Sequence, residues 1–154
     1  SASSVGELAY TPIYEDRIVC VVPKGFQTRY PGRVTVEELR GQRFVIQREG
    51  CNADVNDFLE KYHLSGGGGS CIVDDMSAMA LVMGGYGVCL VPELVIRNLP
   101  FEVDVYPLDV EEKRTIVLAS MRADTFAPAV QRMYDYIIGR FQDDTDSKGD
   151  EKGT

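Results

Sequence analysis

Few residues of this chain have the types and spacing that catalysis needs. The only histidine, His63, stands near the end of a predicted amphipathic helix, where a solvated side chain suits the negative end of the helix dipole. Two adjacent carboxylates, Asp74 and Asp75, precede another predicted helix, and we expect Asp75 to cap it rather than to act as an acid or base. Because nucleophilic catalysis usually needs a base beside a serine or cysteine, we predict no enzyme and no cofactor.

The four cysteines, Cys20, Cys51, Cys71 and Cys89, do not form a metal-binding pattern. None belongs to a C-x-x-C pair, and one histidine is too few to complete a zinc site. Cys20 and Cys89 lie in apolar runs and are expected to be reduced core cysteines of a cytosolic protein. Cys51 lies in a polar loop and is the candidate for thiol reactivity.

Two glycine-rich stretches, 66–69 and 83–88, do not fit nucleotide-binding loops. The first lacks the lysine and hydroxyl residue of a P-loop, the second is not G-x-G-x-x-G, and both lead from a helix into a strand. The four glycines at 66–69 therefore indicate a mobile connector on the side away from any ligand, not a tether between domains. Both a natural glycine run and an engineered replacement of a stickier segment fit this pattern.

Three loops that follow predicted strands could instead bind a small molecule. In open α/β sheets, ligands bind outside the carboxyl ends of the strands, where loops lead into helices. Free N–H groups and positive dipole ends at helix N-termini suit a carboxylate or another small anion. The three loops contain the candidate ligand-binding residues Gln47, Arg48, Glu49, Gly50, Cys51, Asn52, Asp75, Met76, Ser77, Pro92 and Glu93.

The composition narrows the class of protein. The 154 residues are 44% hydrophobic and 26% charged, which is typical of one soluble globular domain. No run approaches the roughly 18 apolar residues of a membrane helix, and the first residues lack the pattern of a signal peptide, so we expect a cytoplasmic protein. The net charge of −8, without a basic cluster, argues against nucleic-acid contact by this chain. The acidic tail, 142–154, is expected to be disordered.

Strands and helices are predicted to alternate along the chain. Apolar runs predict strands at 17–23, 43–47, 71–75, 87–92 and 114–121, of which the first and the last are expected to be buried. Alternation predicts an extended strand at 101–109. Helices are predicted at 34–39, 53–63, 76–83, 93–99 and from residue 128 onwards. Their start and stop signals are Thr35 with Glu38, Asn52, Gly84 with Gly85, and Pro128. This order is typical of an α/β domain with a largely parallel or mixed sheet covered on both faces.

Four segments in register resemble the regulatory domain of LysR-type transcriptional regulators. They are YTPIYEDRIVCVVPKG (10–25), VTVEELRGQRFVIQREG (34–50), DDMSAMALVMGGYGVCLVPE (74–93) and YPLDVEEKRTIVLASM (106–121), followed by the apolar helix after Pro128. The resemblance implies a fold like a type 2 periplasmic binding protein, with two α/β subdomains and a cleft for a small effector. It implies that residues 8–141 are a fragment of the effector-binding domain, which lacks the DNA-reading helix-turn-helix and most of the first subdomain.

In this interpretation, about 18–107 form the second regulatory subdomain, and 108–141 supply the closing strand and helix of the first. The expected partner is a small-molecule effector such as a carboxylate or an aromatic compound. Exposed apolar faces on 114–141 predict a homo-oligomer. One alternative is a lobe of a solute-binding protein or of a related ligand-binding or enzymatic domain, and another is a fragment that folds but binds nothing.

Overall fold

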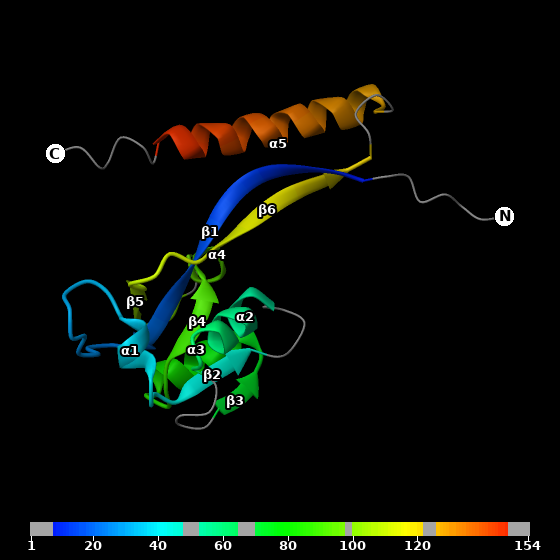
Figure 1. The fold of residues 1–154 in the computed structure, drawn as a ribbon. Coiled ribbons are helices and arrows are strands. Elements are labelled where there is room, and N and C mark those ends of the chain that lie inside the picture. Colours follow the sequence, from blue (N-terminus) through cyan, green and yellow to red (C-terminus); the bar gives the residue numbers. More distant parts are fainter. Residues whose placement is uncertain (1–7, 48–52, 65–69, 98–99, 122–125, 148–154) are drawn as a thin grey trace. The chain divides into compact units, whose positions relative to one another are not determined.

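The computed structural model describes residues 8–47, 53–64, 70–97, 100–121 and 126–147 (Figure 1). The chain divides into two compact units. Unit 2 is Asp16–Arg114, and unit 1 combines Ser1–Glu15 with Thr115–Thr154. Strands β1 (Ala9–Pro23) and β6 (Lys113–Ser120) each cross from one unit into the other, so two strands connect the units.

The strands of unit 2 form a mixed arrangement. In it, β1 pairs antiparallel with β4 (Cys89–Pro92) on one side and with β5 (Val103–Pro107) on the other. Next to β4 lies β2 (Phe44–Gln47), held by a parallel bridge between Phe44 and Val88. The last strand, β3 (Ser70–Val73), pairs parallel with β2. The predicted strands are therefore present, although β1 begins well before its apolar run.

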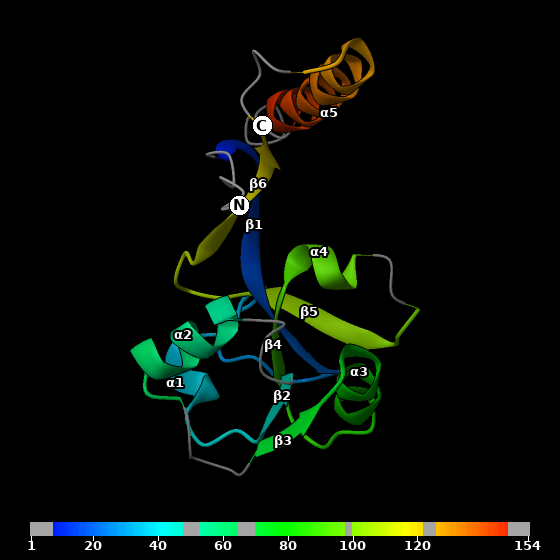
Figure 2. The ribbon, with the colours of Figure 1, turned by 90° about the vertical axis from the view of Figure 1, so that its right-hand side faces the viewer.

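Helices cover both faces of these strands (Figure 2). On one side lie α1 (Val36–Leu39) and α2 (Ala53–Lys61), and on the other lies α3 (Asp75–Met83). A short helix, α4 (Glu93–Ile96), follows β4 directly. The expected mixed, doubly covered sheet is confirmed.

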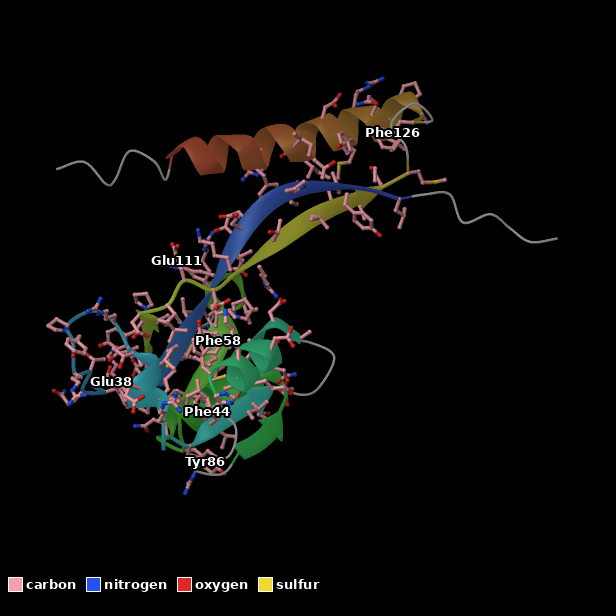
Figure 3. The ribbon with its side chains drawn as sticks, viewed as in Figure 1. Glu38, Phe44, Phe58, Tyr86, Glu111 and Phe126 are labelled. Atoms are coloured by element: carbon pink, nitrogen blue, oxygen red, sulfur yellow. The ribbon has the colours of Figure 1, made fainter. Side chains whose placement is uncertain are left out.

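The alternation of β1 explains this layering. Successive side chains of a strand point to opposite faces, so one strand can serve two cores. Ile18, Cys20 and Val22 belong to the cluster under α1 and α2, together with Phe44 and Phe58, which Figure 3 labels. The cluster under α3 is built from Val19, Val21, Val45, Ala78, Met79, Val82, Cys89 and Val91.

Two cysteines lie in these cores, as predicted. Cys20 and Cys89 are fully buried and have free thiols. Burial is the main cause that raises the pKa of both thiols, that of Cys89 to about 12. Both are therefore structural and poor nucleophiles.

The helix boundaries test the predicted caps. The Thr35–Glu38 capping box opens α1, and Gly85, at φ +78°, follows the C-cap Gly84 of α3. The Tyr86 N–H donates to the Leu81 carbonyl at 2.9 Å, which completes a Schellman motif. The predicted cap of α3 is wrong by one residue, because Asp74, not Asp75, is the N-cap.

Unit 1 contains the first part of β1, most of β6, and α5 (Pro128–Ser147), which begins at Pro128 as predicted. The expectation of disorder from residue 142 is wrong for residues 142–147, which continue α5. Within the unit, Tyr14 makes an edge-on ring contact with Phe141 at 6.4 Å, and Thr11 shares a hydrogen bond with Tyr134 at 2.7 Å. The prediction of a buried strand at 114–121 is wrong, since residues of β6 alternate between exposed and half-buried. An apolar run shows that both faces of a strand are apolar, not that both are covered.

Candidate functional site

The carboxyl ends of three strands meet at one edge of unit 2, as the sequence predicts. Gln47, the last residue of β2, pairs with Val73, the last residue of β3. Since β4 runs parallel to β2, Pro92 ends at the same edge. We call this edge, with the residues that follow the three strands, the site edge. It is where a small ligand binds in open α/β sheets.

Only some of the predicted ligand-binding residues belong to the part of the chain that the structure describes, and these lie at the site edge. Asp75 and Met76 are exposed in the first turn of α3, Ser77 is half-buried beside them, and Pro92 and Glu93 follow β4. The backbone of Gln47 lies at the end of β2. Arg48, Glu49, Gly50, Cys51 and Asn52 lie outside the described residues, and so do the glycines at 66–69.

The residue that follows the glycine run, Ser70, belongs to the described part of the chain. Ser70 pairs with Phe44 at the amino end of β2. The connector therefore enters β3 at the end opposite to the site edge.

The first turn of α3 already holds a carboxylate of the chain. The Ser77 N–H donates to Asp74 Oδ1 at 3.0 Å, and its hydroxyl donates to Asp74 Oδ2 at 2.7 Å. These two bonds, the backbone one first, lower the pKa of Asp74. The N–H group of Ser77 is therefore not free for a ligand, contrary to expectation.

The start of α4 holds a second carboxylate, which the sequence did not indicate. The Leu94 N–H donates to Asp16 Oδ1 at 3.1 Å, and Asp16 is only 1% exposed. The neighbouring Glu93 accepts two hydrogen bonds from Arg17, from Nε at 2.9 Å and from Nη2 at 3.1 Å. Of the three predicted ligand loops, the one after β4 is thus tied to β1 by two carboxylates.

Asp16 also binds a residue far along the chain. Arg114 donates to Asp16 Oδ2 from Nε at 3.1 Å and from Nη2 at 2.9 Å. One buried carboxylate therefore joins β1, α4 and β6 within unit 2. The only signal in the sequence is an acidic residue directly before an apolar strand, which does not identify its partners.

Other chemistry is limited in the described part of the chain. His63 is exposed at the end of α2 with φ +53°, which confirms the solvated helix-end histidine. No cluster of three or more possible metal ligands occurs among the described residues. None of the described helices combines the length and the apolar character that crossing a lipid bilayer requires.

Unit 1 contains an apolar groove of about 650 Å³ between β6 and α5. Its lining includes Leu118, Met121, Phe126, Val130, Met133 and Ile137. The side chains of Met121 and Met133 are more than half exposed. This surface agrees with the predicted apolar face of 114–141.

The family model described as the LysR substrate binding domain matches residues 3–142. This chain belongs to that family. The resemblance seen in four sequence segments is confirmed, and with it the assignment to the effector-binding domain of a LysR-type transcriptional regulator.

Solved structures agree on the fold. The regulatory domain of CcmR from Synechocystis PCC6803, in complex with 2-PG, superposes with a TM-score of 0.69 at 13% identity, over 92% of this chain and 70% of that one. The effector-binding domain of QuiR, in complex with shikimate, gives 0.69 at 15% identity, over 93% of this chain and 69% of that one. Together with the family match, these structures confirm the type 2 periplasmic-binding-protein-like fold.

Full-length regulators are considerably longer than the matched part. The full-length BenM E226K mutant gives a TM-score of 0.72 at 16% identity, over 94% of this chain and 50% of that one. The chain therefore spans about half the length of that regulator. A search of curated protein sequences found no match.

Proposed function

We propose that this LysR-family domain binds its small-molecule effector at the site edge, and that binding rather than catalysis is its activity. The observation that carries the proposal is the meeting of three parallel strand ends, Gln47, Val73 and Pro92, at one edge. Unit 2 would correspond to the second regulatory subdomain, and unit 1 to part of the first. DNA contact would belong to a helix-turn-helix of the full-length regulator in the cytoplasm.

The charges of the site edge suggest how a ligand would be oriented. Asp74 and Asp75 are adjacent in sequence at the start of α3, so a further anion there would meet repulsion. In the sequence, Arg48 follows the end of β2 directly. We therefore place an anionic group of the effector near the end of β2, and its hydroxyl or apolar part near Ser77 and Met76.

Two related structures support a small polar effector. The CcmR regulatory domain was solved in complex with 2-PG, and the effector-binding domain of QuiR in complex with shikimate. For this chain we propose the broader class of small carboxylates and aromatic compounds. The pattern of Asp74, Ser77 and the end of β2 favours a carboxylate that also carries hydroxyl groups.

The proposal is tested by titrating the chain with shikimate and a panel of small aliphatic and aromatic carboxylates. We expect at least one compound to give saturable shifts of amide resonances in the first turn of α3. Met76→Ala should weaken that binding, since Met76 is 55% exposed at the site edge. Met83→Ala is the matched control, because Met83 is 50% exposed at the other end of the same helix.

Two outcomes would contradict this function. One is a folded protein in which no panel compound shifts the α3 resonances. The other is a bound compound whose affinity falls equally in Met76→Ala and Met83→Ala.

A further inference from the structure

A short polar segment of unit 2 makes hydrogen bonds and ion pairs with elements that are distant in sequence. Residues 109–114 lead from β5 into β6, and Glu111, labelled in Figure 3, marks their position. Asp109 accepts a hydrogen bond from the Val36 N–H at 2.8 Å, at the start of α1. The backbone N–H of Asp109 donates to the Val34 carbonyl at 3.1 Å. The first turn of α1 is thus fixed to this segment.

The second contact of this segment is at Glu112. Its Oε1 accepts a hydrogen bond from the Tyr62 hydroxyl at 2.8 Å and pairs with the Lys61 ammonium. Both partners stand at the end of α2, the helix that follows the loop after β2. The backbone carbonyl of Glu112 accepts from the Ile18 N–H at 3.0 Å. One residue therefore joins α2 to β1.

The third contact is the most buried. Arg114 binds Asp16 with two donors, and the other oxygen of Asp16 holds the Leu94 N–H of α4. Arg114 is 24% exposed and Asp16 1%. Removing one member of a buried ion pair is strongly destabilising, because the remaining charge has no partner. Loss of this contact should therefore be costly for β1, α4 and β6 together.

The same two residues stand where the chain leaves unit 2. The boundary between the units falls between Glu15 and Asp16 on β1, and between Arg114 and Thr115 on β6. Asp16 and Arg114 are thus the last residues of unit 2 on both connecting strands.

We propose that Asp16, Asp109, Glu112 and Arg114 form a polar seam that transmits effector binding from the site edge to the two connecting strands. The inference rests on the proposed function, because it requires a ligand at the site edge. Two helices that follow strands of that edge, α2 and α4, are held by the seam. A ligand that shifts either helix must alter the bonds that hold β1 and β6. Asp16 and Arg114 are positioning residues in this proposal and do not touch the ligand.

The test compares amide hydrogen exchange in Arg114→Gln and Lys113→Gln. The control removes the same charge one residue away, at a side chain that is 45% exposed and 3.6 Å from the carboxylate of Glu111. Arg114→Gln should raise the exchange rates of the Leu94 and Ile18 amides about tenfold or more, and leave the β2–β3 amides unchanged. Lys113→Gln should match the wild type.

Repeating the exchange measurement with a bound compound distinguishes transmission of ligand binding from a loss of stability. A panel compound that binds the wild type should change the exchange of the Ile18 amide. Arg114→Gln should bind the same compound without that change. If Arg114→Gln does not fold, Arg114→Lys replaces it, since lysine keeps the charge but not the paired donors. The exchange rates of the Leu94 and Ile18 amides should then rise, but by less than the roughly tenfold change expected for Arg114→Gln.

The seam is excluded if Arg114→Gln behaves like Lys113→Gln, or if exchange rises uniformly throughout unit 2. Transmission is excluded if the liganded variant shows the wild-type change at Ile18. If no panel compound binds, the proposed function fails, while the ligand-free comparison of the two variants still decides whether the seam exists.

Discussion

Arg114 donates two hydrogen bonds, at 3.1 and 2.9 Å, to the same oxygen of Asp16, although the two residues are 98 positions apart. The other oxygen of that carboxylate accepts the Leu94 N–H. Because Asp16 is almost completely buried, its partners lose their acceptor at a position that water reaches poorly when the carboxylate is removed.

Asp16→Ala should therefore lower the free energy of unfolding by about 3 kcal/mol, since it leaves a guanidinium and a backbone N–H without their acceptor. Urea denaturation monitored by circular dichroism measures this change. Glu111→Ala serves as the control, because Glu111 is 86% exposed and should cost less than about 0.5 kcal/mol. Equal losses in the two variants would contradict the assigned role of Asp16.

Gly87 is predicted to be essential for the junction between β2 and β4. A Cβ atom added there would lie 2.2 Å from the Arg43 carbonyl oxygen, which accepts the Val88 N–H. Gly87→Ala should thus separate the strands that form the site edge and destabilise the fold by about 3 kcal/mol. Thermal unfolding tests this. Gly84→Ala is the matched control, since its added Cβ would meet the nearest atom at 3.4 Å, with φ −74°.

Local signals in the sequence predicted the element boundaries well. The Thr35–Glu38 pair, the Gly84–Gly85 pair and Pro128 each act within a few residues, so their physical effect is readable without a fold. The cap of α3 shows the limit of such signals. Two adjacent aspartates are equally suited to cap a helix, and the Ser77 hydroxyl three residues after Asp74 selects the first.

Long-range partners could not be predicted in the same way. Nothing near Asp16 in the sequence points to Arg114 or to the N–H group of Leu94. The sequence therefore does not show that the Asp16 carboxylate already accepts a hydrogen bond from the N-terminus of α4. For the same reason, the sequence predicted which strands end at the site edge but not which of its donors are already occupied. That information depends on side chains that only the folded sheet brings together.

The stability of unit 2 should depend on pH through Glu112. Hydrogen bonds from Lys61 and Tyr62 lower the pKa of this carboxyl group from its ordinary value of 4.5. A depressed pKa means that the folded state favours the charged form of Glu112. The carboxylate therefore makes its full contribution to the free energy of unfolding above pH 4.5. This contribution is lost as the pH falls from there through the folded-state pKa.

Glu112→Gln should therefore flatten the decrease in unfolding free energy that sets in as the pH falls below about 4.5. Urea denaturation at several pH values measures the slope. Glu111→Gln removes the same charge from the adjacent residue and should retain the wild-type slope. A Glu112→Gln curve that runs parallel to the wild type would show that the Lys61 and Tyr62 contacts do not stabilise the fold.

Self-association should depend on the apolar surface of unit 1. Val130, Met133 and Tyr136 are about half or more exposed on α5, and Met121 is exposed just after β6. Burying such a surface against a second copy is favourable by roughly 25 cal/mol for each Å² of apolar area. Met133→Lys should shift the protein towards monomer in sedimentation velocity at high micromolar concentration, whereas Met83→Lys, on α3 of unit 2, should not. A wild-type protein that sediments strictly as a monomer under these conditions would rule out association through this surface.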